Sequence, residues 1–299
     1  MKSPIIIGTR GSELALWQAN YIKSELENLG FPSELKIIKT QGDQIQHLSF
    51  DKMEGKGFFT KEIEEALLNE SIDMAVHSHK DLETKSPESL VVAAVTNRAA
   101  VEDILIIRKE SVDTTKTLLL KENAVVGTSS SRRKVQMAFH RSDCATADLR
   151  GNVPTRIQKL RDKNYDAILL ARAGVERLEI DLSEFEVVML KPEQFVPAPA
   201  QGALALQCRA ADSELQQVLS NLHDINTAAC VEIERSILSS LNGGCQLPLG
   251  VYVSFDGSEY VGHAAYAKNV SESVNYFSMR KVDPAQVQLH LLGLINSVE

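Results

Sequence analysis

The chain contains the sequence Ile-Ile-Gly-Thr-Arg-Gly-Ser at residues 6–12 and the similar sequence Val-Val-Gly-Thr-Ser-Ser-Ser at residues 125–131. Each starts with β-branched apolar residues, which are typical of a buried strand, and continues into a turn rich in glycine and serine. A helix is expected after each turn, with Ser12 as the N-cap of the first. This repeated strand–turn–helix plan predicts two α/β domains of one type.

The helix expected after residue 12 carries apolar side chains at helical spacing, which predicts one buried face. The members of this face are Leu14, Trp17, Tyr21, Ile22, Leu26 and Leu29. Further on, residues 73–76 and residues 165–170 have the composition of buried strands, and each is entered from a helical pattern. In open α/β sheets, ligands bind beyond the carboxyl ends of the strands, close to helix N-termini. We therefore expect a ligand in a cleft between the two domains.

The last third of the chain has a different pattern. A helix that ends near Leu241 leads to a Gly-Gly-Cys loop, and two alternating strands, residues 249–255 and 259–267, are joined by the hairpin signal Asp-Gly. An amphipathic helix is expected near residues 284–296. Because residues 96–102 and 191–199 resemble crossovers, the predicted domains are residues 1–97 with 198–216, residues 98–197, and a small α+β domain of residues 217–299.

Composition excludes several classes of protein. The chain has 299 residues and a formal net charge of -8, which argues against a general nucleic-acid or anionic-membrane surface. No apolar run approaches the roughly 18 residues of a membrane helix, and the N-terminal run is too short for a signal peptide. The four cysteines form no Cys-x-x-Cys pair, so neither a disulfide framework nor a zinc knuckle is expected. These features predict a reduced, cytoplasmic protein that binds neither nucleic acid nor membrane.

Arginines gather at predicted connections between strands and helices. They are Arg10, Arg132, Arg133, Arg150, Arg156 and Arg177. A guanidinium group binds a carboxylate through two parallel hydrogen bonds, and Ser12, Ser129 and Ser130 would add donors at helix N-termini. Taken singly, each arginine is better explained as a solvated surface residue. Six at equivalent positions in an acidic protein predict a site for a ligand with several carboxylates or phosphates.

The residues Lys80-Asp81 follow the predicted strand at residues 73–76. Their position places a carboxylate at the mouth of the expected cleft, where it can accept hydrogen bonds from N–H groups and stabilise a developing cation. A structural salt bridge or helix cap is the alternative. The nearby His77 and His79 lack a third ligand at suitable spacing, so we expect polar residues at a strand end and no metal site.

Cys245 follows two glycines, whose conformational freedom allows a tight loop to present a side chain, and Pro248 stiffens the exit. This pattern makes Cys245 a candidate nucleophile or attachment point, although no Cys-His arrangement supports a protease. Cys208 and Cys230 lie in apolar segments and are expected to be buried. The chain has neither a Walker phosphate loop nor a Gly-x-Ser-x-Gly elbow, so nucleotide binding and acyl transfer are unsupported.

Together, these motifs resemble those of the porphobilinogen deaminase family, also called hydroxymethylbilane synthases. The resemblance covers nearly the whole chain and includes residues 9–19, 55–59, 76–81, 127–133, 149–153, 201–203 and 243–246. It implies two domains of the type II periplasmic-binding-protein kind plus a third α+β domain. It also implies a monomeric transferase of haem and porphyrin biosynthesis, which joins four porphobilinogen molecules head to tail, releases ammonia each time and yields hydroxymethylbilane.

The same resemblance implies roles for individual residues. Cys245 would hold a dipyrromethane cofactor through a thioether, and Asp81 would be the catalytic carboxylate. Lys52, Lys56 and Phe59 would belong to a mobile active-site loop. The implied cofactor- and substrate-binding residues are Arg10, Ser12, Lys80, Ser129, Ser130, Arg132, Arg133, Arg150, Gly151, Asn152, Arg156, Arg177 and Gln201. Because pyrroles of this pathway carry acetate and propionate groups, the arginines have the charge that such ligands require.

The chain departs from the family pattern at Leu82-Glu83, at Ala200 and at Arg172. The first two departures concern local backbone shape, and Arg172 would either touch the cleft or lie on the surface. One rival function is a non-catalytic binding protein for a polycarboxylate or oxyanion, but such a receptor needs neither Asp81 nor Cys245. Another is a phosphate-directed transferase, which the missing phosphate loop and metal-binding carboxylates argue against.

Overall fold

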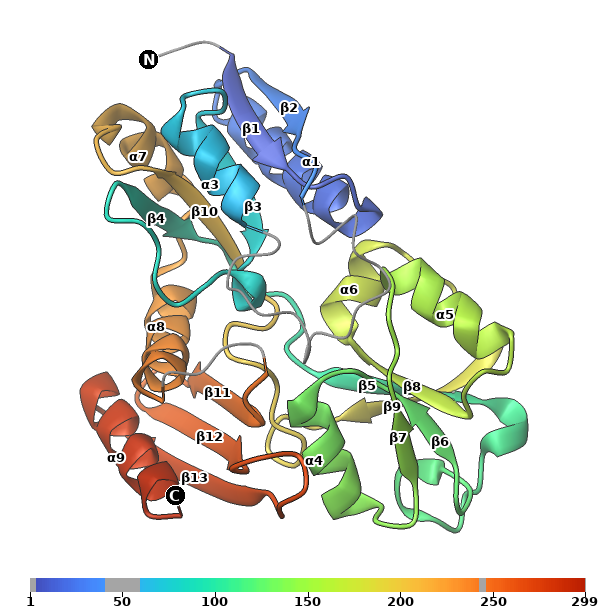
Figure 1. Cartoon of the computed structure of the whole chain (residues 1–299). Coiled ribbons are helices and arrows are strands. Elements are labelled where there is room, and N and C mark those ends of the chain that lie inside the picture. Colours follow the sequence, from blue (N-terminus) through green and yellow to red (C-terminus); the bar gives the residue numbers. More distant parts are fainter. Residues whose placement is uncertain (1–3, 41–59, 242–245, 299) are drawn as a thin grey trace. The chain divides into compact units, whose positions relative to one another are not determined.

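The computed structural model describes residues 4–40, 60–241 and 246–298 (Figure 1). The chain divides into two compact units, Met1–Ala99 with Gly202–Val231 and Ala100–Gln201 with Glu232–Glu299. Each unit is described by itself below. The boundaries of the three domains expected from the sequence stay a prediction.

Unit 1 is built on a five-stranded sheet in the order β2-β1-β3-β10-β4. β1 runs parallel to β2 and β3, whereas β10 runs antiparallel to β3 and β4. The strands are β1 (Ile5–Thr9), β2 (Ser33–Ile37), β3 (Met74–Ser78), β4 (Leu90–Val95) and β10 (Leu204–Arg209), and the helices are α1 (Glu13–Asn28), α3 (Lys61–Leu68) and α7 (Ser213–Leu219). The sheet is therefore completed by a strand that follows the third one by more than a hundred residues.

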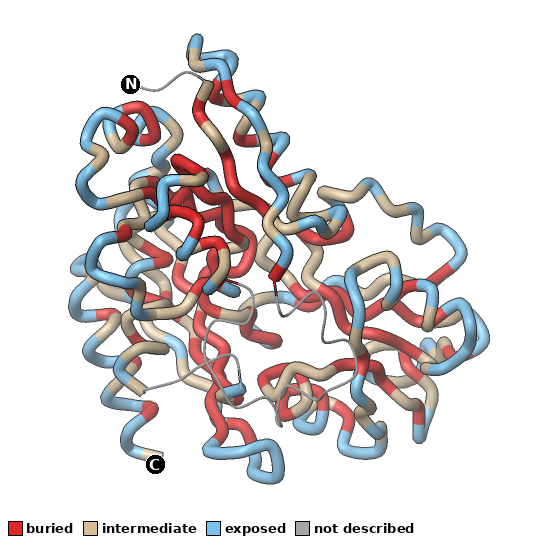
Figure 2. Tube along the Cα trace, turned by 45° about the horizontal axis from the view of Figure 1, so that its top comes forward, coloured by how far each residue is buried: buried red, intermediate tan, exposed pale blue. Residues whose placement is uncertain are grey.

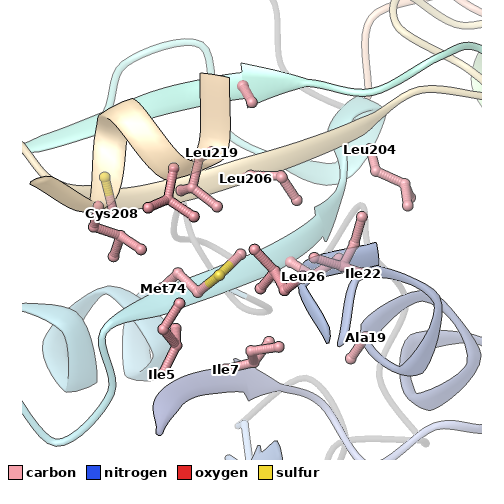
Figure 3. Close-up of a cluster of buried hydrophobic side chains, with 14 residues drawn as sticks. Ile5, Ile7, Ala19, Ile22, Leu26, Met74, Leu204, Leu206, Cys208 and Leu219 are labelled. Atoms are coloured by element: carbon pink, nitrogen blue, oxygen red, sulfur yellow. The ribbon is translucent and has the colours of Figure 1, made fainter. Parts of the chain in front are cut away.

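The main core of unit 1 lies between this sheet and the helices α1 and α7 (Figure 3). Ile7 of β1, Met74 of β3 and Leu206 of β10 are fully buried there against Ile22 and Leu26 of α1. The opposite face of the sheet packs against the buried face of α3 through a second, smaller cluster. Burial of both faces explains why β1, β3 and β10 are almost entirely buried. Figure 2 shows such buried stretches of the trace alternating with exposed ones.

The face that α1 buries differs from the predicted one. α1 buries Gln18, Ala19, Ile22 and Leu26, whereas Trp17, Tyr21 and Leu29 are 36%, 40% and 42% exposed. The prediction that those three side chains are buried was wrong. The buried polar residue Gln18 faces the sheet, and this sets the rotation of α1 about its axis; the spacing of apolar residues alone could not show it. The Trp17 and Tyr21 rings instead stack on each other, with centroids 5.7 Å apart.

Unit 2 contains a second five-stranded sheet, in the order β7-β6-β8-β5-β9. It has the same arrangement as the first: β6 runs parallel to β7 and β8, and β5 runs antiparallel to β8 and β9. The elements are β5 (Asp103–Arg108), β6 (Val125–Gly127), α4 (Ser131–His140), β7 (Ala145–Ala147), α5 (Val153–Arg161), β8 (Ala167–Ala171), α6 (Arg172–Arg177) and β9 (Phe185–Leu190). The shared topology confirms the predicted repeat of one α/β plan.

The C-terminal part of the chain forms a three-stranded antiparallel sheet. It comprises β11 (Leu249–Phe255), β12 (Tyr260–Tyr266) and β13 (Asn275–Lys281), preceded by α8 (Ile225–Ser240) and followed by α9 (Pro284–Asn296). The predicted hairpin is confirmed: β11 pairs with β12, and Gly257 has the positive φ of 98° that the tight turn requires. β13 was not predicted, because its sequence alternates weakly between apolar and polar residues.

This small sheet is covered by α9, which buries Val287, Leu291 and Ile295 against it. An α/β protein with an added α+β portion is thereby confirmed. Short 3-10 helices connect some elements: η2 (His79–Asp81), η3 (Lys109–Ser111), η4 (Thr117–Leu119) and η5 (Ser220–Leu222). Among the described residues, no helix is both long and apolar enough to span a membrane.

Candidate active site

A pocket of about 90 Å³ in unit 1 lies where β1 and β3 end. These two strands are parallel, so their carboxyl ends meet at the same edge of the sheet, where ligands of α/β proteins bind. The pocket is lined by Arg10, Ser12, Leu14, Ala15, Gln18, Thr60, Ile63, Val76, His77, Ser78 and Asp81. The structure thus brings together Arg10, Ser12 and Asp81, which the sequence predicted as site residues in two separate segments.

The segment around Arg10 is fixed by the start of α1. The Ser12 hydroxyl accepts a hydrogen bond from the backbone N–H of Ala15 at 3.3 Å, which confirms it as the N-cap. Thr9, which is buried, donates its hydroxyl hydrogen to the Ala15 carbonyl at 3.1 Å. The chain on both sides of Arg10 is therefore bonded to the first turn of α1, and the half-buried side chain of Arg10 lines the pocket.

Gln18 was missed by the sequence analysis. Its side chain is 2% exposed, and its amide nitrogen donates to the Ser78 hydroxyl at 2.9 Å. This bond joins α1 to the end of β3, three residues before Asp81. The signal available in the sequence was a single polar residue beside the apolar Ala19 and Ile22, which is too common a pattern to single out.

Asp81 is the last residue of the 3-10 helix η2, which follows β3 without a gap. The backbone N–H of His79 donates to the Ala203 carbonyl at 3.0 Å, which anchors this turn to the start of β10. Asp81 itself is exposed, whereas Leu82 is buried. The departure at Leu82 therefore retains apolar packing, and the carboxylate of Asp81 remains available to a ligand. Lys80 lies beside it in the same turn and is half-buried.

His77 is buried and hydrogen-bonded on the α3 side of the sheet. Its Nε2 lies 3.0 Å from Oε1 of Gln207, whose amide nitrogen donates to Glu64 at 3.0 Å. Since a carboxylate only accepts, Gln207 must turn its oxygen to His77, and His77 carries its proton on Nε2. Burial lowers the pKa of His77 to about 4, so the ring is neutral. In the described part of the chain, no group of three residues is arranged to hold a metal ion.

In unit 2, Arg132 and Arg133 occupy the first turn of α4 and are only 4% and 6% exposed. Both bind Asp103, the first residue of β5: Arg132 Nη1 lies 2.7 Å from Oδ2, and Arg133 Nη2 lies 2.7 Å from Oδ1. The possibility that these two arginines are solvated surface residues is thereby excluded. Asp103 was missed because it lies 29 residues before Arg132 and looks, in the sequence, like a polar strand end.

The charges in this cluster are strongly coupled. Burial by itself raises the pKa of Asp103, but the charges and hydrogen bonds of the two arginines outweigh burial and hold that pKa well below its usual range. Gln201, which is predicted to bind the ligand, donates to Asp103 Oδ1 at 3.0 Å and to the Val101 carbonyl at 2.7 Å. It therefore helps to hold the Asp103 carboxylate in place.

The turns that follow β6 and β7 are joined by Ser129, whose hydroxyl bonds both the N–H and the carbonyl of Leu149 at 3.0 Å. Ser130 caps α4, and Asn152 caps α5 by accepting from Thr155 N at 2.9 Å. Gly151 has a φ of 114°, and a Cβ there would lie 2.7 Å from the Thr155 side chain, so the turn requires glycine. These residues shape the turns and place backbone N–H groups at two helix N-termini.

The remaining arginines of unit 2 lie near these turns or at a helix end. Arg150 precedes Gly151, and Arg156 donates from Nε to the Gly151 carbonyl at 2.7 Å. Arg177 is the last residue of α6, the short helix that directly follows β8. The side chains of Arg150, Arg156 and Arg177 are all half-buried. Arg172 forms ion pairs with Glu176 and Glu102, so this departure is accounted for by local charge pairing. Lys52, Lys56, Phe59 and Cys245 lie outside the described residues.

Comparison with known proteins decides the family. The family model described as "Porphobilinogen deaminase, dipyromethane cofactor binding domain" matches residues 5–217, and the model of the "Porphobilinogen deaminase, C-terminal domain" matches residues 228–261. The chain belongs to the porphobilinogen deaminase family. The first match contains the Arg10 pocket and the Arg132 cluster, and the second contains Cys245.

Relatives of this family are similar over most of their length. A porphobilinogen deaminase of Nitratiruptor sp. is 45% identical over 250 residues, which are 84% of this chain and 78% of the relative. One of Chloroherpeton thalassium is 40% identical over 294 residues, 96% of this chain and 91% of the relative.

Solved structures of periplasmic binding proteins also align with the chain. A periplasmic substrate-binding protein from Coxiella burnetii aligns with a TM-score of 0.45 and 13% identity, over 75% of this chain and 94% of the other. The aliphatic sulphonate binding protein from Escherichia coli aligns with a TM-score of 0.43 and 13% identity, over 81% and 71%. These values are too low to support an argument about function.

The described residues fit the cofactor of the porphobilinogen deaminase family. A dipyrromethane with acetate and propionate side chains is a polyanion, and it requires cationic groups in a place sheltered from water. The Arg132–Arg133 pair has two charges against the single carboxylate of Asp103, and Arg10, Arg150, Arg156 and Arg177 are half-buried. No described residue group suggests a metal instead.

Proposed function

We propose that this chain is a porphobilinogen deaminase, which condenses four porphobilinogen molecules head to tail and releases one ammonia for each. The product after hydrolysis is hydroxymethylbilane, a precursor of haem and other tetrapyrroles. The family match over residues 5–217, together with the convergence of Asp81, Arg10 and Ser12 on one pocket, supports this activity. A simple receptor for polycarboxylates has no use for an exposed carboxylate beside the cationic group that would bind its ligand.

Asp81 is the proposed catalytic residue. When ammonia leaves the aminomethyl group of porphobilinogen, the pyrrole nitrogen supplies the electron pair and the substrate becomes an azafulvenium cation. A carboxylate beside that nitrogen accepts its N–H hydrogen bond and stabilises the positive charge. Asp81 is suited to this task because it is exposed in η2, the turn that directly follows the buried strand β3.

The arginines are proposed to bind the carboxylates of cofactor and substrate. Arg10 serves this role in unit 1, together with Ser12 and Lys80. In unit 2 the proposed groups are the side chains of Arg132, Arg133, Arg150, Arg156 and Arg177 and the turn residues Ser129, Ser130, Gly151 and Asn152. Dipyrromethane, when bound, supplies the α-carbon to which the first substrate is joined. The protein's part is to fix both reactants and exclude water.

Residues outside the described part of the chain complete the proposal. Cys245 is proposed as the thioether attachment point, and Lys52, Lys56 and Phe59 as parts of the active-site loop. Gln201 is proposed to act indirectly, through Asp103. We further propose that the protein is monomeric and cytoplasmic and has three domains. We also propose that it does not bind nucleic acid, in keeping with its net charge of -8.

Turnover of porphobilinogen by the purified chain tests this function. Tetrapyrrole product, measured by its absorbance after oxidation, should form with the wild type and fall by at least about a hundredfold with Asp81→Asn, the usual size of a lost charge-stabilising group. Glu88→Gln, an exposed change in the same unit outside the pocket, is the matched control and should turn over normally. No product from the wild type, or equal rates for both variants, would contradict the proposal.

A further inference from the structure

The cluster of Asp103, Arg132 and Arg133 has one uncompensated positive charge. In the described ranges, Asp103 is the only carboxylate that forms an ion pair with either arginine. Burial raises the pKa of Tyr276, the other ionisable neighbour of Arg132, well above its usual range, so its phenol is neutral. Buried charges are normally paired. A net charge of +1 in this place therefore indicates that an anionic ligand completes the cluster.

The hydrogen bonds of the two guanidinium groups show which of their donors are already used. Arg132 uses Nη1 for Asp103 and for the Val196 carbonyl at 2.9 Å. Arg133 uses Nη2 for Asp103 and Nη1 for the Leu169 carbonyl at 3.0 Å. The Nε atoms of both arginines are buried, and neither has a hydrogen-bond partner in the described structure. Because buried N–H donors are almost always paired, these two Nε–H groups can donate to an acceptor on a ligand.

We infer that Asp103 is a positioning residue, which holds one nitrogen of each guanidinium so that the Nε–H donors of Arg132 and Arg133 face a single ligand carboxylate. This inference rests on the proposed function, which supplies that carboxylate as an acetate or propionate group of a pyrrole. Asp103 does not touch the ligand itself. It acts by fixing two long side chains that would otherwise lose conformational freedom when the ligand binds.

The position of Asp103 is itself rigid. It opens β5, and it pairs with Ala171 of β8 on one side and with Leu190 of β9 on the other. Gln201 donates to its Oδ1 and, with the same nitrogen, to the Val101 carbonyl. A carboxylate fixed on a central strand positions its partners more accurately than one on a loop. Gln201, which the sequence analysis placed among the ligand-binding residues, thus contributes to the rigidity of this support.

Charge alone and positioning predict opposite effects of Asp103→Asn. Loss of the negative charge changes the cluster from +1 to +2, which by simple attraction would strengthen binding of an anionic ligand. In the positioning account, the asparagine oxygen accepts from one arginine while its NH₂ group repels the other, which turns away. Asp103→Glu keeps the charge but moves the carboxylate by one methylene, so it displaces both guanidinium groups without unpairing them.

Cofactor loading of the full-length chain distinguishes these accounts. Apo-protein from cells that make no porphobilinogen is mixed with porphobilinogen, and intact mass follows the gain of the dipyrromethane over time. We expect the porphobilinogen concentration for half-maximal loading to rise at least about tenfold with Asp103→Asn, which corresponds to about 1.4 kcal/mol. It should also rise with Asp103→Glu, whose melting temperature should stay near that of the wild type.

Asp166→Asn is the matched control, because Asp166 also supports unit 2 by accepting from Ser111 and from the Val125 N–H but does not contact the arginines. It should lower the melting temperature and leave half-maximal loading unchanged. Loading of both Asp103 variants at the wild-type concentration or below, or an equal rise with Asp166→Asn, would overturn the positioning role. If Asp103→Asn does not fold, Asp103→Glu decides alone. A wild-type chain that gains no mass would refute the proposed function instead.

Discussion

Glu234 of α8 joins two distant segments of unit 2 through their backbone, and its replacement has a predictable cost. The side chain is fully buried; Oε2 accepts from Ala200 N at 2.6 Å, and Oε1 accepts from Val253 N at 2.7 Å. Glu234→Gln has almost the same shape but keeps one acceptor oxygen. The NH₂ group of the glutamine must face either the Ala200 N–H or the Val253 N–H, and it cannot accept a hydrogen bond from that group.

The magnitude follows from the two hydrogen bonds. A buried donor without an acceptor costs about 1–3 kcal/mol, and the substituted NH₂ group adds a second unmet donor, so we expect a loss of about 2–4 kcal/mol. For a chain of this size each kcal/mol lowers the melting temperature by about 2–4 °C, which gives a decrease of about 5–15 °C. Scanning calorimetry measures it, with Glu232→Gln on the exposed side of the same helix as the control. A Glu234→Gln protein that melts within about 1 °C of the wild type would refute the reasoning.

Three further predictions concern single side chains. Ala200 has a φ of 62°, a left-handed conformation that costs a residue with a Cβ about 1–2 kcal/mol. Because glycine loses more entropy on folding, Ala200→Gly should raise the free energy of unfolding by about 0.5–1 kcal/mol in urea denaturation, and a lower midpoint would count against this. Burial lowers the pKa of His77 from 6.5 to about 4, so the unfolded chain binds more protons in this window and stability falls as the pH drops from 6.5 to 4, by at most about 3 kcal/mol. His77→Gln should flatten that part of the stability curve and the exposed His290→Gln should not; equal slopes for wild type and His77→Gln would be the contrary result. Burial raises the pKa of Cys208 to about 11, so iodoacetamide at pH 8 should label it only after denaturation, and rapid labelling of the folded protein would disprove this.

Local sequence patterns predicted the repeated architecture well. The strand–turn–helix segments at residues 6–12 and 125–131 became β1 with α1 and β6 with α4, and Ser12 caps α1 as predicted. Capping and turn formation depend on neighbours within a few residues, so the sequence contains the whole signal. The same holds for the Asp-Gly hairpin between β11 and β12.

Elements whose stability comes from distant partners were not predicted. Residues 198–216 were assigned to the first domain from the sequence, but the antiparallel pairing of β10 with β3 was not predicted, because this pairing has no local signature. The buried face of α1 was partly misassigned for a related reason, because the contact of Gln18 with Ser78 spans 60 residues. Periodicity identifies a helix, but the partner that it meets decides how the helix is turned.

Candidate site residues were predicted by type and place, but their internal support was not. Arg10, Ser12 and Asp81 do line one pocket. The sequence could not show that Arg132 and Arg133 are buried and form ion pairs with Asp103. Nor could it show that Gln201, which follows β9 in the chain, donates a hydrogen bond to Asp103 at the start of β5. Such contacts are made between residues 29 to 98 positions apart, where only the folded chain brings charges together.

The central claim, a cofactor covalently bound by a porphobilinogen deaminase, is tested most directly by the intact mass of the purified protein. The mass of protein from cells that make porphobilinogen should exceed the mass calculated from the sequence. The difference should equal the mass of two porphobilinogen molecules minus that of two ammonia molecules. The added mass should lie on the peptide that contains Cys245 and be absent from Cys245→Ser. A mass equal to that of the sequence, with Cys245 freely alkylated, would contradict the account.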